Sequence, residues 1–294
     1  MDALRWHQRP KLRHPVLITA FAGWNDAADS ATGAVEYLGR VWEAKEFAEV
    51  DPEEFFDFTV ARPQIRLTDD LARHVDWPST SLAAASVPGG RRDVVLLHGT
   101  EPGLRWRSFC ETVVGAASGL GIEMVVSLGA LLADVPHTRP VRVTGTAADP
   151  ELVGRLGLRQ SRYEGPTGIL GVLHEAFAGS GIPSASLWAN VPHYVAQSPS
   201  PKATLALVRR TASLLGTRVE TLDLEVATSA YERQVNELVA ADEDAAAYVA
   251  RLEEAGDDGG DDGEGDGGEE DRGPIAGDQL VDEVAQFLRD HHGD

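Results

Sequence analysis

The chain has 294 residues, of which 43% are hydrophobic, and a formal net charge of −21 at pH 7. This length is enough for one large folded domain or two modest ones, with a sizeable core. The negative charge argues against a nucleic-acid partner, because phosphate binding needs a basic face, and the single cysteine excludes an intramolecular disulfide and fits a cytoplasmic protein.

The first predicted elements are a strand and a helix. Residues 16–18 are an apolar run typical of a buried strand, and apolar residues recur at three- and four-residue spacing over 27–38. Between them, Gly23 permits a tight turn, and Asn25 or Asp26 can cap the first helical amides. The pattern predicts the first half of a βαβ unit. Its turn either only connects the two elements or also lines a ligand site.

The middle of the chain predicts an α/β domain over residues 1–200. Segment 45–90 has no convincing long helix and is expected to be an antiparallel insertion at a sheet edge, with strands at 55–61, 62–67 and 82–87. From there on, strands at 93–98, 124–128, 141–145 and 185–189 alternate with helices at 104–120, 149–156 and 167–178. The alternation predicts three layers: a mostly parallel sheet with helices on both faces.

Residues 201–255 show only helical periodicity. One helix is predicted at 202–215, and a second pattern with heptad-like spacing runs from 221 to 252, weakened by Thr228 and Asp242. We expect a helical hairpin that packs on the α/β domain. A helix that joins copies of the chain is the alternative.

The last segment divides into an acidic linker, 256–276, and a short amphipathic helix, 277–294. Residues 257–271 are nine acidic residues and six glycines, which offer no apolar surface and predict disorder. The helix behind them is either a docking element or a fraying end. Its predicted partner-binding residues are Leu280, Val284, Phe287 and Leu288.

Polar residues gather in the loops that follow the predicted strands. In a parallel sheet such loops meet at one edge, where ligands bind. The candidate ligand-binding residues are Gly23, Asn25, Asp26, Glu101, His137, Arg139, Thr167, His193 and Tyr194. Among them, Glu101, His137 and His193 are candidates for acid–base catalysis. The simpler interpretation is that Glu101 pairs with Arg139 and that the His–Pro loops only pack.

Known site motifs are otherwise missing from the sequence. It contains no Gly-Lys-Ser/Thr phosphate loop, no Gly-x-Ser-x-Gly elbow and no complete Gly-x-Gly-x-x-Gly. No histidine pair has the spacing of a metal site. We therefore expect no cofactor and no metal. No apolar stretch is long enough to cross a bilayer, so no membrane segment is expected.

The polar loops also carry a family resemblance. The matching stretches are FAGWNDA (21–27), GTEP (99–102), DVPHTRP (134–140), GPTGI (165–169) and LWANVPHY (187–194). As a set they resemble the proteasome assembly chaperone family, in its actinobacterial branch. The resemblance implies a fold similar to that of the nucleoside phosphorylases, and homo-oligomers, with a trimer as one form. Eukaryotic and archaeal relatives help to assemble proteasome rings.

The sequence departs from the family at residues 291–294. Some members end in a hydrophobic–tyrosine–any residue signal that inserts between proteasome subunits, and this stretch has no tyrosine. Two hypotheses follow. The first is a non-enzymatic, oligomeric protein that binds or assembles other proteins. The second is a hydrolase- or phosphorylase-type enzyme that acts on a small anionic or nucleoside-like substrate at the carboxyl edge of the sheet.

Overall fold

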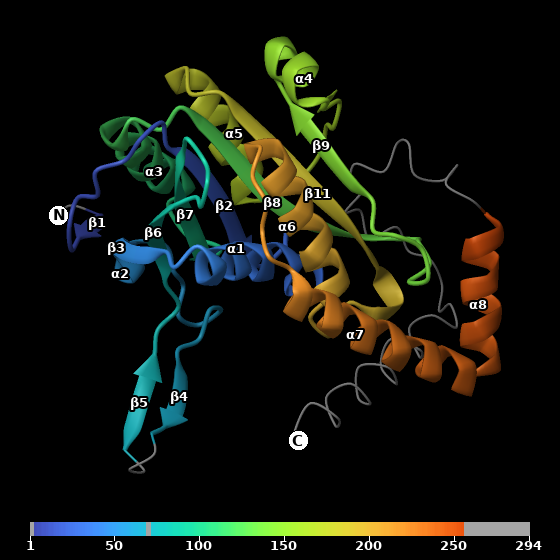
Figure 1. Ribbon diagram of the computed structural model, residues 1–294. Helices are drawn as coiled ribbons and strands as arrows, with labels where there is room; N and C mark the ends of the chain where they lie inside the picture. Colours follow the sequence, from blue (N-terminus) through green and yellow to red (C-terminus); the bar gives the residue numbers. More distant parts are fainter. Residues whose placement is uncertain (1–2, 69–71, 256–294) are drawn as a thin grey trace.

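The computed structural model describes residues 3–68 and 72–255, which are built around one large sheet (Figure 1). Within these residues the sheet has nine strands, in the spatial order β1 (Leu4–Trp6), β3 (Lys45–Val50), β6 (Thr80–Ser86), β7 (Asp93–Thr100), β2 (Val16–Ala22), β8 (Met124–Ala133), β11 (Ser184–Pro192), β9 (Val143–Ala147) and β10 (Arg159–Gln160). A separate hairpin of β4 (Gln64–Leu67) and β5 (Arg73–Asp76) projects from the body.

The sheet is mixed, so the prediction of a mostly parallel sheet is only partly right. Its four central strands, β7, β2, β8 and β11, are parallel to one another, as the βα alternation indicated. β1, β3 and β6 pair antiparallel, and β6 is antiparallel to β7 because residues 87–92 join the two strands as a hairpin. β9 runs antiparallel to β11, because the loop at 134–142 turns the chain back beyond that strand.

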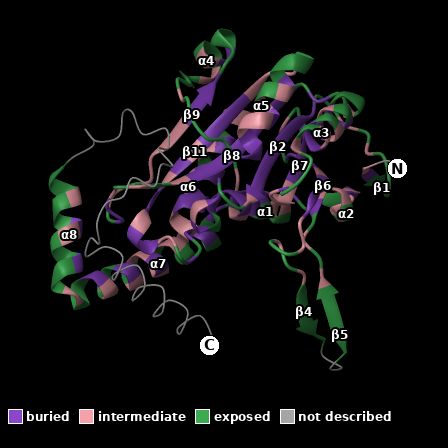
Figure 2. Ribbon diagram, turned by 180° about the vertical axis from the view of Figure 1, so that it is seen from behind, coloured by how far each residue is buried: buried purple, intermediate pink, exposed green. Residues whose placement is uncertain are grey.

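Helices cover both faces of the sheet. The helical elements are the 3-10 turns η1 (Ala27–Asp29) and η2 (His193–Val195) and the helices α1 (Ser30–Val41), α2 (Pro52–Phe55), α3 (Trp106–Leu120), α4 (Pro150–Leu156), α5 (Ile169–Ser180), α6 (Pro201–Leu215), α7 (Leu222–Ala241) and α8 (Glu243–Glu254). α1 and α6 pack together on one face, and α3 and α5 on the other. Buried residues concentrate along the central strands, whereas the β4–β5 hairpin is exposed (Figure 2).

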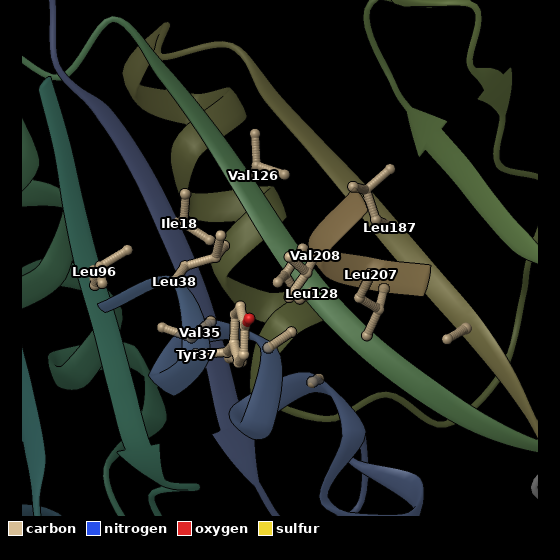
Figure 3. Packing of buried hydrophobic residues seen from close by; sticks show 14 of the residues in the cluster. Ile18, Val35, Tyr37, Leu38, Leu96, Val126, Leu128, Leu187, Leu207 and Val208 are labelled. Atoms are coloured by element: carbon tan, nitrogen blue, oxygen red, sulfur yellow. The ribbon is translucent and has the colours of Figure 1, made fainter. Parts of the chain in front are cut away.

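β2 shows why the centre of the sheet is apolar on both faces. Val16 and Ile18 belong to the cluster on the α1/α6 side, while Leu17 and Phe21 belong to the cluster on the α3/α5 side. Side chains of a strand point alternately to opposite faces, so a strand that is covered twice reads as an unbroken apolar run. On the α1/α6 side, Ile18 packs with residues of α1, α6 and the neighbouring strands (Figure 3). Each fully buried side chain of this kind contributes about 1.5–3 kcal/mol.

The prediction of a strand at 55–61 is wrong. The chain instead forms the short helix α2, whose first turn is capped by the Asp51 side chain, which accepts from the Glu53 amide at 3.2 Å. A turn follows, in which the Asp57 carboxylate accepts from the Thr59 amide at 2.8 Å and from the Thr59 hydroxyl at 2.6 Å. Local hydrogen bonds from aspartate side chains compete with the β ladder and override the apolar pattern.

The helix pattern at 221–252 is two helices. The Asp242 carboxylate accepts from the backbone amides of Asp244 and Ala245, at 2.8 and 2.9 Å, and so begins α8 where the heptad spacing predicted continuity. α7 and α8 pack against η2 through an apolar cluster that includes Tyr194, Val235 and Val249. The predicted linker at 256–276 and the predicted helix at 277–294, with its partner-binding residues, lie outside the described residues. Among the residues described, no helix is both long and apolar enough to cross a bilayer.

Candidate functional site

Glu101 lies where the ends of β2 and β7 face the start of α5. Its backbone amide donates to the carbonyl of Ala22, at 2.9 Å, which ties the residue to the end of β2. The carboxylate accepts from the backbone amide of Ile169 at 2.8 Å through Oε1, and from that of Trp24 at 3.4 Å through Oε2. A carboxylate at this position satisfies a free amide of the helix and complements its dipole. Gly168 is the N-cap residue of α5, Thr167 precedes it, and Glu101 supplies the side-chain acceptor.

Two glycines allow this close approach. Gly23 has a φ of +143°, a region that favours glycine, and a Cβ there would lie 2.9 Å from Glu101 Oε2. A Cβ on Gly168 would lie 2.1 Å from Oδ1 of Asn25. Asn25 is 6% exposed, and its Oδ1 atom has no hydrogen-bond partner within the described part of the chain. Gly23, Asn25, Glu101 and Gly168 therefore form one tightly packed polar junction, which we call the Glu101 junction.

Asp26 has a different role from its neighbour Asn25. Its carboxylate accepts from the backbone amide of Ala31 at 2.6 Å and from the hydroxyl of Thr32, and so caps the start of α1. Burial raises the pKa of Asp26 above its ordinary value, although these hydrogen bonds act in the opposite direction. The sequence prediction that Asn25 or Asp26 caps the first helix is confirmed for Asp26.

His137 lies in a second polar group, beside the C-terminal half of α7. The Tyr194 hydroxyl accepts from the His137 backbone amide at 2.7 Å and lies 2.8 Å from Nδ1, so its proton is directed to Nδ1. Nε2 then carries the ring proton and donates to Oδ1 of Asn236 at 3.0 Å. Burial lowers the pKa of His137, which keeps the ring neutral near pH 7. The Lys202 ammonium donates to the carbonyl of the same residue at 2.5 Å.

His193 and Arg139 lie beside α8. The His193 Nδ1 atom lies 3.2 Å from the Asp134 carboxylate, and its Nε2 atom lies 3.4 Å from the Tyr248 hydroxyl. The Arg139 guanidinium donates to the backbone carbonyl of Glu253, near the end of α8. Among the described residues, Glu101 and Arg139 form no ion pair with each other. The alternative in which these two residues pair is therefore not what the structure shows.

The structure thus places most of the predicted site residues in two groups, with Asp26 and Thr167 in neither. Gly23, Asn25 and Glu101 meet in the Glu101 junction, while His137, Arg139, His193 and Tyr194 hold the 134–142 loop and η2 against α7 and α8. Both oxygens of Glu101 and both ring nitrogens of His137 already have partners within the chain. The contacts of both groups serve to position backbone and helices.

The sequence pattern did not single out His174, a partly buried histidine on α5. The His174 ring on α5 contacts the Ser127 hydroxyl through Nε2 at 2.5 Å and the Ser184 hydroxyl through Nδ1 at 2.8 Å. Burial lowers the pKa of His174 to about 4, so the ring is neutral. Ser127 is only 2% exposed, which places this serine–histidine contact in the interior. A lone histidine on an apolar helix face was the available signal.

Two hollows on the described surface have other linings. One, of about 170 Å³, is lined by Arg142, Val143, Thr144, Gly145, Gly157, Arg159 and Arg210. The other, of about 200 Å³, lies between the N-terminal segment and strands β3 and β6 and includes Lys11 and Phe47. Neither is lined by Glu101, His137 or His193. Glu46 and Glu49 on β3 and His7, which follows β1, place their potential metal ligands within 4.8 Å of one another.

Comparison with known proteins identifies what the chain is similar to. The sequence profile of the PAC2 family matches residues 20–239. A PAC2 family protein from Streptomyces avermitilis is 47% identical, and the match covers 80% of this chain and 99% of that protein with a TM-score of 0.74. A Mycobacterium tuberculosis homologue of the proteasome-assembly chaperones is 46% identical, with coverage of 80% and 99% and a TM-score of 0.73.

A more distant match shows the fold alone. It is an archaeal proteasome activator from Pyrococcus furiosus, 16% identical, with coverage of 81% of this chain and 99% of that one and a TM-score of 0.67. The search of curated proteins returned no match to the chain.

Proposed function

Because the chain belongs to the PAC2 family, we propose that it is a non-enzymatic, oligomeric protein that binds and helps to assemble other proteins, with proteasome-related proteins as its partners. The relative from Mycobacterium is a homologue of the proteasome-assembly chaperones, and it matches this chain at 46% identity over nearly its whole length. Such a protein acts by contact, so its function depends on the surfaces that it exposes.

The observation that carries the proposal is the β4–β5 hairpin. Its two strands form a sheet of their own, separate from the large sheet, and they project from the body (Figure 1). Ile65 and Leu67 on β4 are 63% and 65% exposed, and Val75 on β5 is 39% exposed. A two-stranded hairpin is marginally stable alone, and exposed apolar residues that lie together mark interaction sites. The hairpin is therefore suited to gain its stability from a bound protein.

The contacts of the candidate catalytic residues agree with a binding role. Glu101 holds the start of α5, and His137 holds the loop before β9 against α7. Residues with these roles shape a surface. We propose that the candidate ligand-binding residues act in this way, as the frame behind the contact surface, and that Leu280, Val284, Phe287 and Leu288 add a second contact.

The test measures binding and assembly directly. Purified proteasome subunits from the same organism would be mixed with the chain, and complex formation followed by size-exclusion chromatography with light scattering. We expect Ile65→Ser with Leu67→Ser to weaken the complex at least about tenfold, because two apolar anchors are lost. The matched control is Leu222→Ser with Val226→Ser, since these α7 residues are 65% and 63% exposed.

Separate measurements address the other parts of the proposal. Phe287→Ala with Leu288→Ala should also weaken the complex, whereas Glu101→Gln should leave it intact. Light scattering of the chain alone at micromolar concentration should return a multiple of the 31.5 kDa monomer mass. A monomer mass would contradict the oligomer. Turnover of a nucleoside by the chain, lost in Glu101→Gln, would favour the enzyme hypothesis instead.

A further inference from the structure

Three arginines surround the hollow of about 170 Å³ beside β9. Arg142 lies just before β9, Arg159 is on β10 and Arg210 is on α6. None of the described residues that line the hollow is acidic, although the whole chain carries a net charge of −21. Guanidinium groups bind carboxylates well because their planar donors match the two oxygens. A concentration of positive charge in so acidic a protein indicates a site for an anionic group.

The fold fixes the positions of the three arginines. β10 pairs with β9 in parallel, which sets Arg159 opposite Thr146. The backbone amide of Asn190 on β11 donates to the carbonyl of Arg142 at 3.1 Å, and this bond holds Arg142 at the entrance to β9. The Arg210 guanidinium donates to the carbonyl of Leu156 at 3.4 Å, at the end of α4. The arginines therefore come from three different elements that meet at one side of the sheet.

The described end of α8 contacts the loop that leads to β9, whose last residue before the strand is Arg142. The Thr138 hydroxyl donates to the Glu253 carboxylate at 2.5 Å, and Arg139 donates to the carbonyl of Glu253, so the end of α8 lies on the loop that leads to β9. Arg142 follows Arg139 by three residues, and residue 257 follows the end of α8 by three residues. Three residues span at most about 10 Å. The sequence that follows α8 is therefore long enough to reach Arg142.

We propose that the arginine hollow binds carboxylates and that its occupant is the acidic segment 257–271 of the same chain. That segment is composed of nine acidic residues and six glycines. Glycine has no side chain to obstruct the approach of a neighbouring carboxylate to an arginine. A short tether gives an effective concentration of about millimolar, so the capture needs only weak individual contacts. The binding is electrostatic and is therefore weakened by salt, whose screening length is about 10 Å at 0.1 M.

Zero-length crosslinking of the full chain tests this proposal. Arg159→Lys keeps the positive charge and introduces a primary amine, which a carbodiimide joins to a nearby carboxylate as an amide. We expect mass spectrometry to find crosslinks from this position to residues 257–271 at low salt, with yields that fall at 0.5 M salt. The matched control is Arg218→Lys, an exposed position between α6 and α7. Equal crosslinking of the segment from both positions would overturn the proposal.

Further variants and measurements identify the occupant of the hollow. Added to Arg159→Lys, Arg142→Gln with Arg210→Gln should lower the crosslink yield at least about threefold, since each exposed charge pair contributes modestly. An unchanged yield would contradict a site made by these arginines. Crosslinks that form between chains in a mixture of isotope-labelled and unlabelled protein would overturn the same-chain occupant. A third measurement is the Tm in millimolar inorganic phosphate. If phosphate raises the Tm of the wild-type chain but not that of Arg142→Gln with Arg210→Gln, and no crosslink to 257–271 is found, the hollow is a site for small anions instead.

Discussion

The Oε1 atom of Glu101 accepts a hydrogen bond from the backbone amide of Ile169 at 2.8 Å, so a residue that follows β7 caps a helix that begins 68 positions later. The bond joins two loops at the carboxyl end of the parallel strands. It gives Glu101 a structural role that accounts for a carboxylate at this position, where the sequence pattern indicated acid–base chemistry.

Replacing this carboxylate should destabilise the fold. We expect Glu101→Ala to lower the free energy of unfolding by about 0.5–2 kcal/mol, the usual cost of a lost helix cap. Glu101→Gln should cost less, because its amide oxygen still accepts from Ile169. Urea denaturation measures the difference, with Glu175→Ala on the exposed side of α5 as the control. A loss for Glu175→Ala as large as that for Glu101→Ala would contradict the capping role.

Gly168 should not tolerate a side chain. A Cβ there would lie 2.1 Å from Asn25 Oδ1 and 2.8 Å from Glu101 Oε1, and Asn25 is buried. We expect Gly168→Ala to destabilise the protein by about 1–3 kcal/mol through overpacking. Gly179→Ala in the same helix is the matched control, because nothing lies within 4 Å of its Cβ position. That variant should be neutral or stabilised by up to about 1 kcal/mol, as thermal denaturation would show.

Low pH should lower the free energy of unfolding, because His174 takes up a proton when the chain unfolds. Burial lowers its pKa to about 4, whereas an unfolded histidine titrates near about 6.5. Between these values the unfolded chain binds a proton that the folded chain excludes, so stability falls as the pH falls from about 7 toward 4. The slope reaches about 1.4 kcal/mol per pH unit for one such group.

Urea denaturation at pH 7, 6 and 5 measures this slope. His137 contributes in the same direction, because burial also lowers its pKa. His174→Gln should reduce the slope by up to about 1.4 kcal/mol per pH unit, the contribution of one proton. This holds even if the substitution lowers stability at every pH. A variant with the slope of the wild type would mean that His174 is accessible to protons in the folded protein.

Asp242 should control the last helix. Its carboxylate accepts from the amides of Asp244 and Ala245, so Asp242→Ala removes the cap and should destabilise α8 by about 0.5–2 kcal/mol. Hydrogen exchange should then accelerate in α8 and not in α1. Glu237→Ala on the exposed face of α7 provides the control. Unchanged exchange in α8 would show that packing against η2 alone holds the helix.

The central strands could be predicted because their apolar sequences indicate burial on both faces of a sheet. Residues 16–18 and 94–97 are continuous apolar runs, and the structure buries them on both faces. Such an apolar run does not indicate whether the strand is parallel or antiparallel to its neighbours. β9 was expected to continue the parallel order, but it lies beyond β11 and antiparallel to it, because the route of the 134–142 loop decides its direction. That route depends on contacts with α7 and α8, which are distant in sequence.

The site was predictable only as a set of loops. The sequence indicated that Glu101 and His137 lie in loops at the carboxyl ends of strands, but their partners come from elsewhere in the chain. Glu101 contacts the amide of Ile169, and His137 contacts Asn236 on α7. Neither partner has a local pattern that links it to these loops. The arginine hollow was also missed, since Arg142, Arg159 and Arg210 meet only through the packing of three elements.

The place of β2 in the sheet has a consequence for synthesis. β2 begins at Val16, but it pairs with β7 from Val94 and with β8 from Met124, more than a hundred residues later. At a ribosome speed of roughly 5–20 residues per second, the second partner emerges about 5–20 s after β2. Until β7 has emerged, an apolar strand with two unpaired edges is present on the nascent chain, and one edge stays unpaired until β8 follows. The chain is therefore most exposed to aggregation before residue 133 has been made, and a delay in translation between β2 and β8 would lengthen that exposure.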